Sequence, residues 1–224
     1  MERQKVDINE LKDLLVLSVK AFYKQDRQLV KDDLCERALT FRIGLQLNKA
    51  IKCYHNIYGD VQSEFNKAYS ETVGVMEKRI HLPFGSIKEH NYPDLILFNH
   101  NIGNRIIIEI KKLNKLTRNV HIIDDIYKLY AFTHPTNDDY CYSLGVHLIL
   151  GKDAFLAIWY VNGKIDAVFF HSCNHVRHPW KDDYNQIFMK TKIIYDQYNH
   201  EYCGRIPSYT ASDIRKCFSF MSCN

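Results

Sequence analysis

Two apolar runs stand in the middle of this sequence, NYPDLILF at residues 91–98 and RIIIEIKK at residues 105–112. Both have the length and the branched apolar composition of β-strands. Each also carries an acidic residue, Asp94 in the first and Glu109 in the second, and Lys111 follows Glu109 by two positions. Because side chains alternate faces along a strand, Glu109 and Lys111 lie on the same face about 7 Å apart. Charges on otherwise apolar strands indicate a functional site.

If the two runs pair as neighbouring strands, the carboxylates of Asp94 and Glu109 come close enough to share a divalent cation. The Lys111 ammonium then lies beside it. Oxygen ligands of this kind favour Mg²⁺ or Mn²⁺ over zinc. The alternative is an edge hairpin with one solvated polar face. We favour the site, because Ile107 shares the face of Glu109 and Ile96 shares that of Asp94, which leaves the charges at one end of an apolar face.

The composition predicts one intracellular domain. The chain has 224 residues, of which 46% are hydrophobic, enough for a substantial core. No run approaches about 18 apolar residues, and the start lacks a signal peptide, so we expect a soluble, cytoplasmic protein without a membrane partner. The seven cysteines form no Cys-x-x-Cys pair, which favours reduced thiols. The net charge of +4 permits a polyanionic partner without requiring one.

Two helices are predicted before the strands. The first runs from Asp7 to about Lys24, and the second begins near residue 31 with Asp32 or Asp33 as its N-cap. The apolar stripe of the second helix consists of Leu39, Ile43, Leu47, Ala50 and Tyr54. Glu36 extends this stripe by one turn and is therefore predicted to face inward. The alternative is that Glu36 faces solvent and interacts with the helix dipole.

A third helix and three strands follow. Residues 120–132 have apolar residues at helical spacing and end before Pro135. Apolar runs at 146–150, 154–161 and 164–170 read as strands, and Asn162-Gly163 predicts a tight type I′ turn between the last two. The order is helix, three strands, helix and strand, with a closing β-hairpin. It predicts an α/β (α+β) fold with a mixed central sheet flanked by helices.

Three segments resemble one protein family: Glu36-Arg37-Ala38-Leu39-Thr40-Phe41-Arg42, Val61-Gln62-Ser63-Glu64-Phe65-Asn66 and Tyr92-Pro93-Asp94-Leu95-Ile96-Leu97. With the Glu-x-Lys motif of residues 109–111, they are similar to the PD-(D/E)xK nuclease superfamily, of restriction-endonuclease-like fold. The likeness covers roughly residues 32–150 and is to uncharacterised bacterial or phage-associated members. Phe65 stands where tyrosine is usual, and Gln62 and Ser63 where aspartate often occurs.

The resemblance implies a metal-dependent nuclease, a phosphodiester hydrolase acting on DNA, with core order α-β-β-β-α-β. Asp94 and Glu109 would bind Mg²⁺ or Mn²⁺, with the backbone carbonyl of Ile110 as a third ligand. Lys111 would hold the attacking water or the scissile phosphate. Glu36 would act through a water molecule or a second metal ion.

Two further residues have open alternatives. Glu64 would face the cleft in the family pattern, or would lie on the solvated face of a half-buried strand. Lys128 would contact a phosphate, as basic residues on this helix do in some members, or would form a surface ion pair with Asp124. The whole protein also has an alternative function, as a catalytically silent nucleic-acid-binding or scaffold protein of the same fold. RNA is not excluded as the partner.

The chain is predicted to form a single nuclease-like domain, 1–224. It comprises an N-terminal helix (1–30), a core (31–170) and a C-terminal extension (171–224) that packs on the core or on a second subunit, which would give a homodimer. His171, Cys173, His175, His178 and Cys203 raise the alternative of a zinc site. Their spacing fits no standard zinc finger, so we expect no structural zinc.

Overall fold

The computed structural model describes residues 7–54, 57, 59–63, 92–99, 103–113, 120–135, 141–173 and 189, with the backbone of four short strands between residues 67 and 88. In the helix that begins at residue 120, side chains are described from residue 125. The elements are α1 (Ile8–Lys31), α2 (Glu36–Ile51), β1 (Asp60–Ser63), β2 (Lys67–Ser70), β3 (Gly74–Glu77), β4 (Ile80–His81), β5 (Ile87–Lys88), β6 (Leu95–Asn99), β7 (Gly103–Lys112), α3 (Val120–Thr133), β8 (Leu144–Leu150), β9 (Ala154–Val161) and β10 (Lys164–Ser172).

Helix α1 is two turns longer than its apolar pattern predicts. Asp7 caps its start by accepting a hydrogen bond from the Asn9 N–H at 2.8 Å. Its last two turns carry Arg27 and Lys31, whose charged groups lie 3.4 and 3.7 Å from the Asp153 carboxylate. These contacts with Asp153, a residue remote in sequence, continue the helix where its own sequence becomes polar.

The predicted N-cap of α2 is wrong. Cys35 occupies that position without a side-chain cap, while Asp32 is the C-cap of α1. Asp33 has a positive φ of 56°, and its Oδ1 accepts a hydrogen bond from Lys112 Nζ at 2.7 Å. The aspartates therefore build the turn between the helices and connect it to the end of β7. Glu36 is the first residue of α2, one position after the turn.

Six strands form one mixed sheet in the order β1-β6-β7-β8-β9-β10. Neighbours are antiparallel except β7 and β8, which are parallel and connected through α3. Two separate two-stranded sheets, β2-β3 and β4-β5, complete the described strands. The predicted mixed α/β class is confirmed. Among the helices and the strands of the main sheet, the predicted helix, three strands, helix and strand are α2, β1, β6, β7, α3 and β8, with β9 and β10 as the closing hairpin. The strands β2 to β5, which were not predicted, lie between β1 and β6 in chain order.

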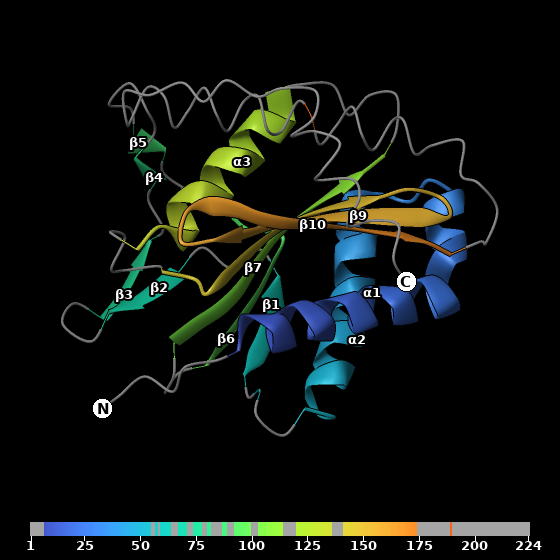
Figure 1. Cartoon of the computed structure of the whole chain (residues 1–224), viewed down its shortest axis with the longest axis horizontal. Helices are drawn as coiled ribbons and strands as arrows, with labels where there is room; N and C mark the ends of the chain where they lie inside the picture. Colours follow the sequence, from blue (N-terminus) through green and yellow to red (C-terminus); the bar gives the residue numbers. More distant parts are fainter. Residues whose placement is uncertain are drawn as a thin grey trace.

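Helices cover both faces of the sheet (Figure 1). One core layer joins α1 and α2 to the face of β7 that carries Ile106, Ile108 and Ile110. The other joins α3 to the opposite face, which carries Ile107 on β7 and Ile96 on β6. Ile96 and Ile107 share one face, as predicted. Because side chains alternate along a strand, Glu109 and Lys111 lie on this α3 face with Ile107. The charges of Glu109 and Lys111 are therefore directed toward α3.

The β9–β10 turn is the predicted type I′ turn. Asn162 and Gly163 both have positive φ, 52° and 69°, as this turn requires. The Gly163 N–H donates a hydrogen bond to the Thr133 hydroxyl at 3.2 Å. A Cβ atom on Gly163 would lie 2.6 Å from the His134 ring. The end of α3 thus packs directly against the turn.

The helices in the described part of the chain include none with both the length and the apolar character needed to cross a membrane. Of the predicted C-terminal extension, residues 171–173 and 189 are described. The proposed packing of that extension on the core or on a second subunit lies outside the described residues.

Candidate active site

Asp94 lies directly before β6, at the point where the pairing of β6 with β7 ends. Because Leu95 pairs with Ile108, the next position places Asp94 opposite Glu109, where Cβ atoms of neighbouring strands are about 5 Å apart. The backbone N–H of Ile110 extends beyond the end of β6, and Asp94 Oδ2 accepts its hydrogen bond at 2.6 Å. The two predicted carboxylate ligands therefore occupy adjacent positions.

Glu109 is 1% exposed, and its Oε1 lies 3.1 Å from Lys128 Nζ. Burial, together with the negative charge of Asp125, raises the pKa of Glu109 well above its ordinary value, and the Lys128 ammonium opposes this shift. Burial also raises the pKa of Asp94, although the hydrogen bond from the Ile110 N–H works in the opposite direction. Both carboxyl groups are therefore harder to ionise than an exposed carboxyl group, and a nearby cation favours their ionised forms.

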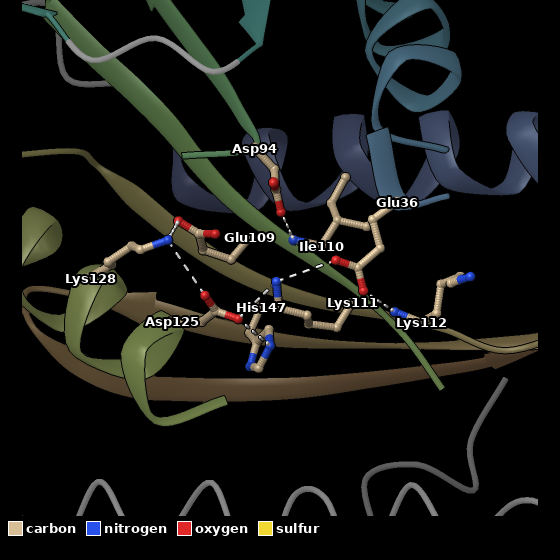
Figure 2. A network of polar contacts seen from close by, with 9 residues as sticks. All are labelled: Glu36, Asp94, Glu109, Ile110, Lys111, Lys112, Asp125, Lys128 and His147. Atoms are coloured by element: carbon tan, nitrogen blue, oxygen red, sulfur yellow. Dashed lines mark hydrogen bonds and ion pairs between the residues drawn. The ribbon is translucent and has the colours of Figure 1, made fainter. Parts of the chain in front are cut away.

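Lys111 lies between a helix on each face of the sheet (Figure 2). Its Nζ is 3.5 Å from Glu36 Oε2 and 3.4 Å from Asp125 Oδ2, and its side chain is 16% exposed. Burial by itself would lower the pKa of Lys111, but the carboxylates of Asp125 and Glu36 outweigh burial and raise it. The ammonium group is therefore charged at neutral pH.

Glu36 reaches the site from the first turn of α2. Besides its ion pair with Lys111, its Oε1 accepts a hydrogen bond from the Lys112 backbone N–H at 3.3 Å. Its side chain remains 40% exposed, so it lies at the edge of the cluster rather than in the core. The inward orientation predicted for Glu36 agrees with these contacts.

Asp125 and His147 belong to the same cluster and were not identified from the sequence. Asp125 is 3% exposed, and its two carboxylate oxygens lie 3.5 Å from Lys128 Nζ and 3.4 Å from Lys111 Nζ. His147 is fully buried on β8, beside Glu109 in the parallel register, and its Nε2 lies 3.8 Å from Asp125 Oδ2. Asp125 thus connects both lysines to a buried imidazole.

Burial lowers the pKa of His147 to about 4, with the attraction of Asp125 only partly opposing it. The imidazole is therefore neutral near pH 7. Within the described residues, neither of its ring nitrogens has a hydrogen-bond partner, and neither does Asp125 Oδ2. Buried polar atoms without partners are rare in folded proteins and commonly mark functional sites.

Sequence signals for these two residues did exist. Asp125 and Lys128 are spaced i,i+3 on a helix, which places both on one face. His147 interrupts the apolar strand Leu144–Leu150, as Glu109 interrupts its own strand. Neither signal, however, indicates that the two side chains meet, because that depends on α3 crossing the sheet.

Of the two alternatives for Lys128, the one that places it at the surface is wrong. Its side chain is 14% exposed and is directed toward Glu109, across the helix–sheet interface. The side chain of Asp124, its predicted partner, lies outside the described part, as does Glu64. For Ile110 the structure shows the N–H bound to Asp94, and the role of its carbonyl as a ligand stays a prediction.

Two of the five residues of the zinc alternative lie in the described part of the chain. The His171 ring packs against Phe155 and Phe169, with centroids 5.4 and 6.4 Å away, and Cys173 is a free thiol. Residues 175, 178 and 203 lie outside the described part. Aromatic packing gives His171 a structural role.

The charges of the cluster suit a divalent cation. Two ammonium groups face four carboxylates, so two negative charges are left when all are ionised; the carboxylates are those of Glu36, Asp94, Glu109 and Asp125. Hard oxygen donors of this kind fit Mg²⁺ or Mn²⁺. Nevertheless, no three His, Cys, Asp or Glu side chains within the described ranges converge as a ready set of metal ligands. The lysines stand among the carboxylates instead.

The chain matches no protein-family model and no curated protein sequence.

Proposed function

We propose that this protein is a metal-dependent nuclease that hydrolyses DNA phosphodiester bonds. The observation that supports this most strongly is the meeting of Asp94, Glu109 and Lys111 where the pairing of β6 with β7 ends, with Glu36 approaching from α2. Their partial burial strengthens electrostatic interactions with a phosphate. The element order α2-β1-β6-β7-α3-β8 with a closing hairpin supports the restriction-endonuclease-like part of the proposal.

In this proposal Asp94 and Glu109 hold Mg²⁺ or Mn²⁺, together with the carbonyl of Ile110. When bound, the cation supplies Lewis-acid chemistry, activating water and stabilising the charge that gathers on the phosphate. Glu36 acts through a water molecule or a second cation. Its 40% exposed side chain leaves room for water.

Lys111 holds the attacking water or a phosphate oxygen. Its ammonium group is charged and is fixed from two sides by Glu36 and Asp125. A preorganised charge of this kind stabilises the transition state without reorganising during the reaction. The remaining lysine of the cluster, Lys128, lies beside Glu109 and Asp125.

The alternative is a catalytically silent nucleic-acid-binding or scaffold protein. One observation favours it specifically, namely that ammonium groups already stand among the carboxylates and no ready set of three metal-ligating side chains occurs in the described residues. Such a protein would bind nucleic acid and leave it intact.

A digestion panel tests the proposal. Linear, circular, single-stranded and branched DNA, and RNA, are each incubated with the protein in Mg²⁺, Mn²⁺ or EDTA. We expect cleavage of DNA in the presence of either metal and none in EDTA. Binding without cleavage of any substrate would support the scaffold alternative, and cleavage of RNA alone would replace DNA as the substrate.

A further inference from the structure

Lys128 and a divalent cation compete for the same carboxylate. Lys128 Nζ lies 3.1 Å from Glu109 Oε1, and the Glu109 side chain is 1% exposed. A divalent cation bound to the Glu109 carboxylate would lie close to this ammonium ion and would repel it. Any cation that binds Glu109 therefore has to weaken the contact with Lys128.

A second carboxylate is already in place for Lys128. Asp125 Oδ1 lies 3.5 Å from the same Nζ, one helical turn away on α3. A charged hydrogen bond is about 2.8 Å long, so the ammonium needs to move by less than about 1 Å to form one with Asp125. Figure 2 shows Lys128 between the two carboxylates.

From this geometry we propose that Asp125 is a positioning residue, which receives Lys128 from Glu109 when a divalent cation binds. The inference rests on the proposed function, since it concerns the same metal site. Asp125 also holds Lys111 through its other oxygen, at 3.4 Å. In the metal-bound state the buried Asp125 carboxylate thereby fixes both lysines. The neutral ring of His147 packs 3.8 Å from this carboxylate.

Calorimetric titration of the full chain with Mn²⁺ at pH 8 tests the exchange independently of cleavage. Burial raises the pKa of Glu109, so a proton could take the place of the Lys128 ammonium on this carboxylate. The alkaline pH limits that replacement. Lys128→Gln removes the competing charge and should bind Mn²⁺ about tenfold more tightly than the parent. Lys112→Met is the matched control, because it removes a similarly buried lysine charge whose Nζ is bound to Asp33 instead, and it should change the affinity less than about twofold.

Asp125→Asn separates positioning from direct binding. In the parent we expect about thirtyfold weaker Mn²⁺ affinity, because the variant loses a negative charge and also the second partner of Lys128. In the Lys128→Gln background no lysine is transferred, so the same change should weaken affinity only about threefold. Equal losses in the two backgrounds would mean that Asp125 acts on the cation directly, and would overturn the inference.

The other outcomes are also distinguishable. A parent protein that binds no Mn²⁺ or Mg²⁺ contradicts the proposed function itself, and the inference with it. Normal binding with unchanged affinity in Lys128→Gln leaves the proposed function intact and overturns the inference. Should the variants not fold, as judged by circular dichroism, NMR of ¹³C-labelled lysines in the parent replaces them. Metal should then shift the NMR signals of the buried lysines. The signal of Lys128 is assigned from its loss in Lys128→Arg, and a Lys128 signal that metal does not shift would refute the exchange.

Discussion

Replacing Lys111 with alanine separates a cleaving enzyme from a binding protein of the same fold. Its Nζ lies 3.5 Å from Glu36 and 3.4 Å from Asp125. At an effective dielectric constant of about 20, one such pair has a gross attraction of about 5 kcal/mol. Most of this is offset by desolvation and by solvent screening of the 40% exposed Glu36. Because Asp125 keeps Lys128 as a partner, we expect the free energy of unfolding to fall by about 1–2 kcal/mol.

The expected effect on cleavage is larger. A fixed charge that acts on the transition state typically contributes about a hundredfold or more in rate, or about 3 kcal/mol. Lys111→Ala should therefore cleave at least about a hundredfold more slowly while its affinity for DNA weakens only modestly. Single-turnover cleavage of linear DNA in saturating Mg²⁺ measures the first quantity, and fluorescence anisotropy with Ca²⁺ measures the second.

Lys112→Ala is a matched control for this experiment. The Lys112 side chain is 14% exposed, close to the 16% of Lys111, and its ammonium binds Asp33 and the Leu34 carbonyl, at the turn between α1 and α2. The variant should lose comparable stability without losing cleavage. If Lys111→Ala cleaves within about threefold of Lys112→Ala, the catalytic role assigned to Lys111 is refuted.

Three further predictions follow from the site. Asp94→Ala and Glu109→Ala should each abolish metal-dependent cleavage, whereas Glu36→Ala should reduce it less, because Glu36 is at the exposed edge; equal losses in all three, measured by the same cleavage assay, would contradict this order. DNA affinity should fall steeply between about 50 and 200 mM salt as phosphate contacts release counterions, and a salt-independent dissociation constant would indicate another kind of partner. In metal-free buffer, the pKa of His147 is lowered by burial to about 4 in the folded protein, from its ordinary value of 6.5. The unfolded chain therefore takes up the proton first, and stability falls as the pH drops through this window. This amounts to about 2 kcal/mol between pH 7 and pH 5, and urea unfolding should show a smaller acid loss in His147→Gln, because that variant has no imidazole to protonate.

The parts of the fold that follow local rules could be predicted from the sequence. Because side chains alternate faces along a strand, the sequence predicts Ile107 and Ile108 on opposite faces, and they pack in different core layers. The pair Asn162-Gly163 predicts the turn that it forms. Asp94 and Glu109 belonged to consecutive strands, and consecutive strands commonly pair. A short, local hairpin was enough to bring their positions together.

The rest depends on contacts between distant segments. Helix α1 continues to Lys31 because Asp153 lies beside its last turns. Asp32 and Asp33 resemble N-cap residues, but the contact of Asp33 with Lys112 favours a turn. Lys128 appeared to be a surface residue because its helix pattern cannot show that a buried glutamate from β7 lies beneath it. Each error has the same physical origin, a charged partner remote in sequence.

The β9–β10 turn and the start of β7 differ in how readily they would tolerate an attached tag or fluorophore. A tag or fluorophore at the β9–β10 turn would disturb the packing of Gly163 against Thr133 and His134, and any displacement would pass along α3 to the site. The start of β7 is less crowded, although the positive φ of Gly103, 97°, disfavours any other residue at that position itself. At Gly103, no described atom lies within 4 Å of where a Cβ would stand. Gly103 is also at the opposite end of the β6–β7 pair from Asp94 and Glu109, so a dye or surface linker attached near it would lie away from the cluster of charges.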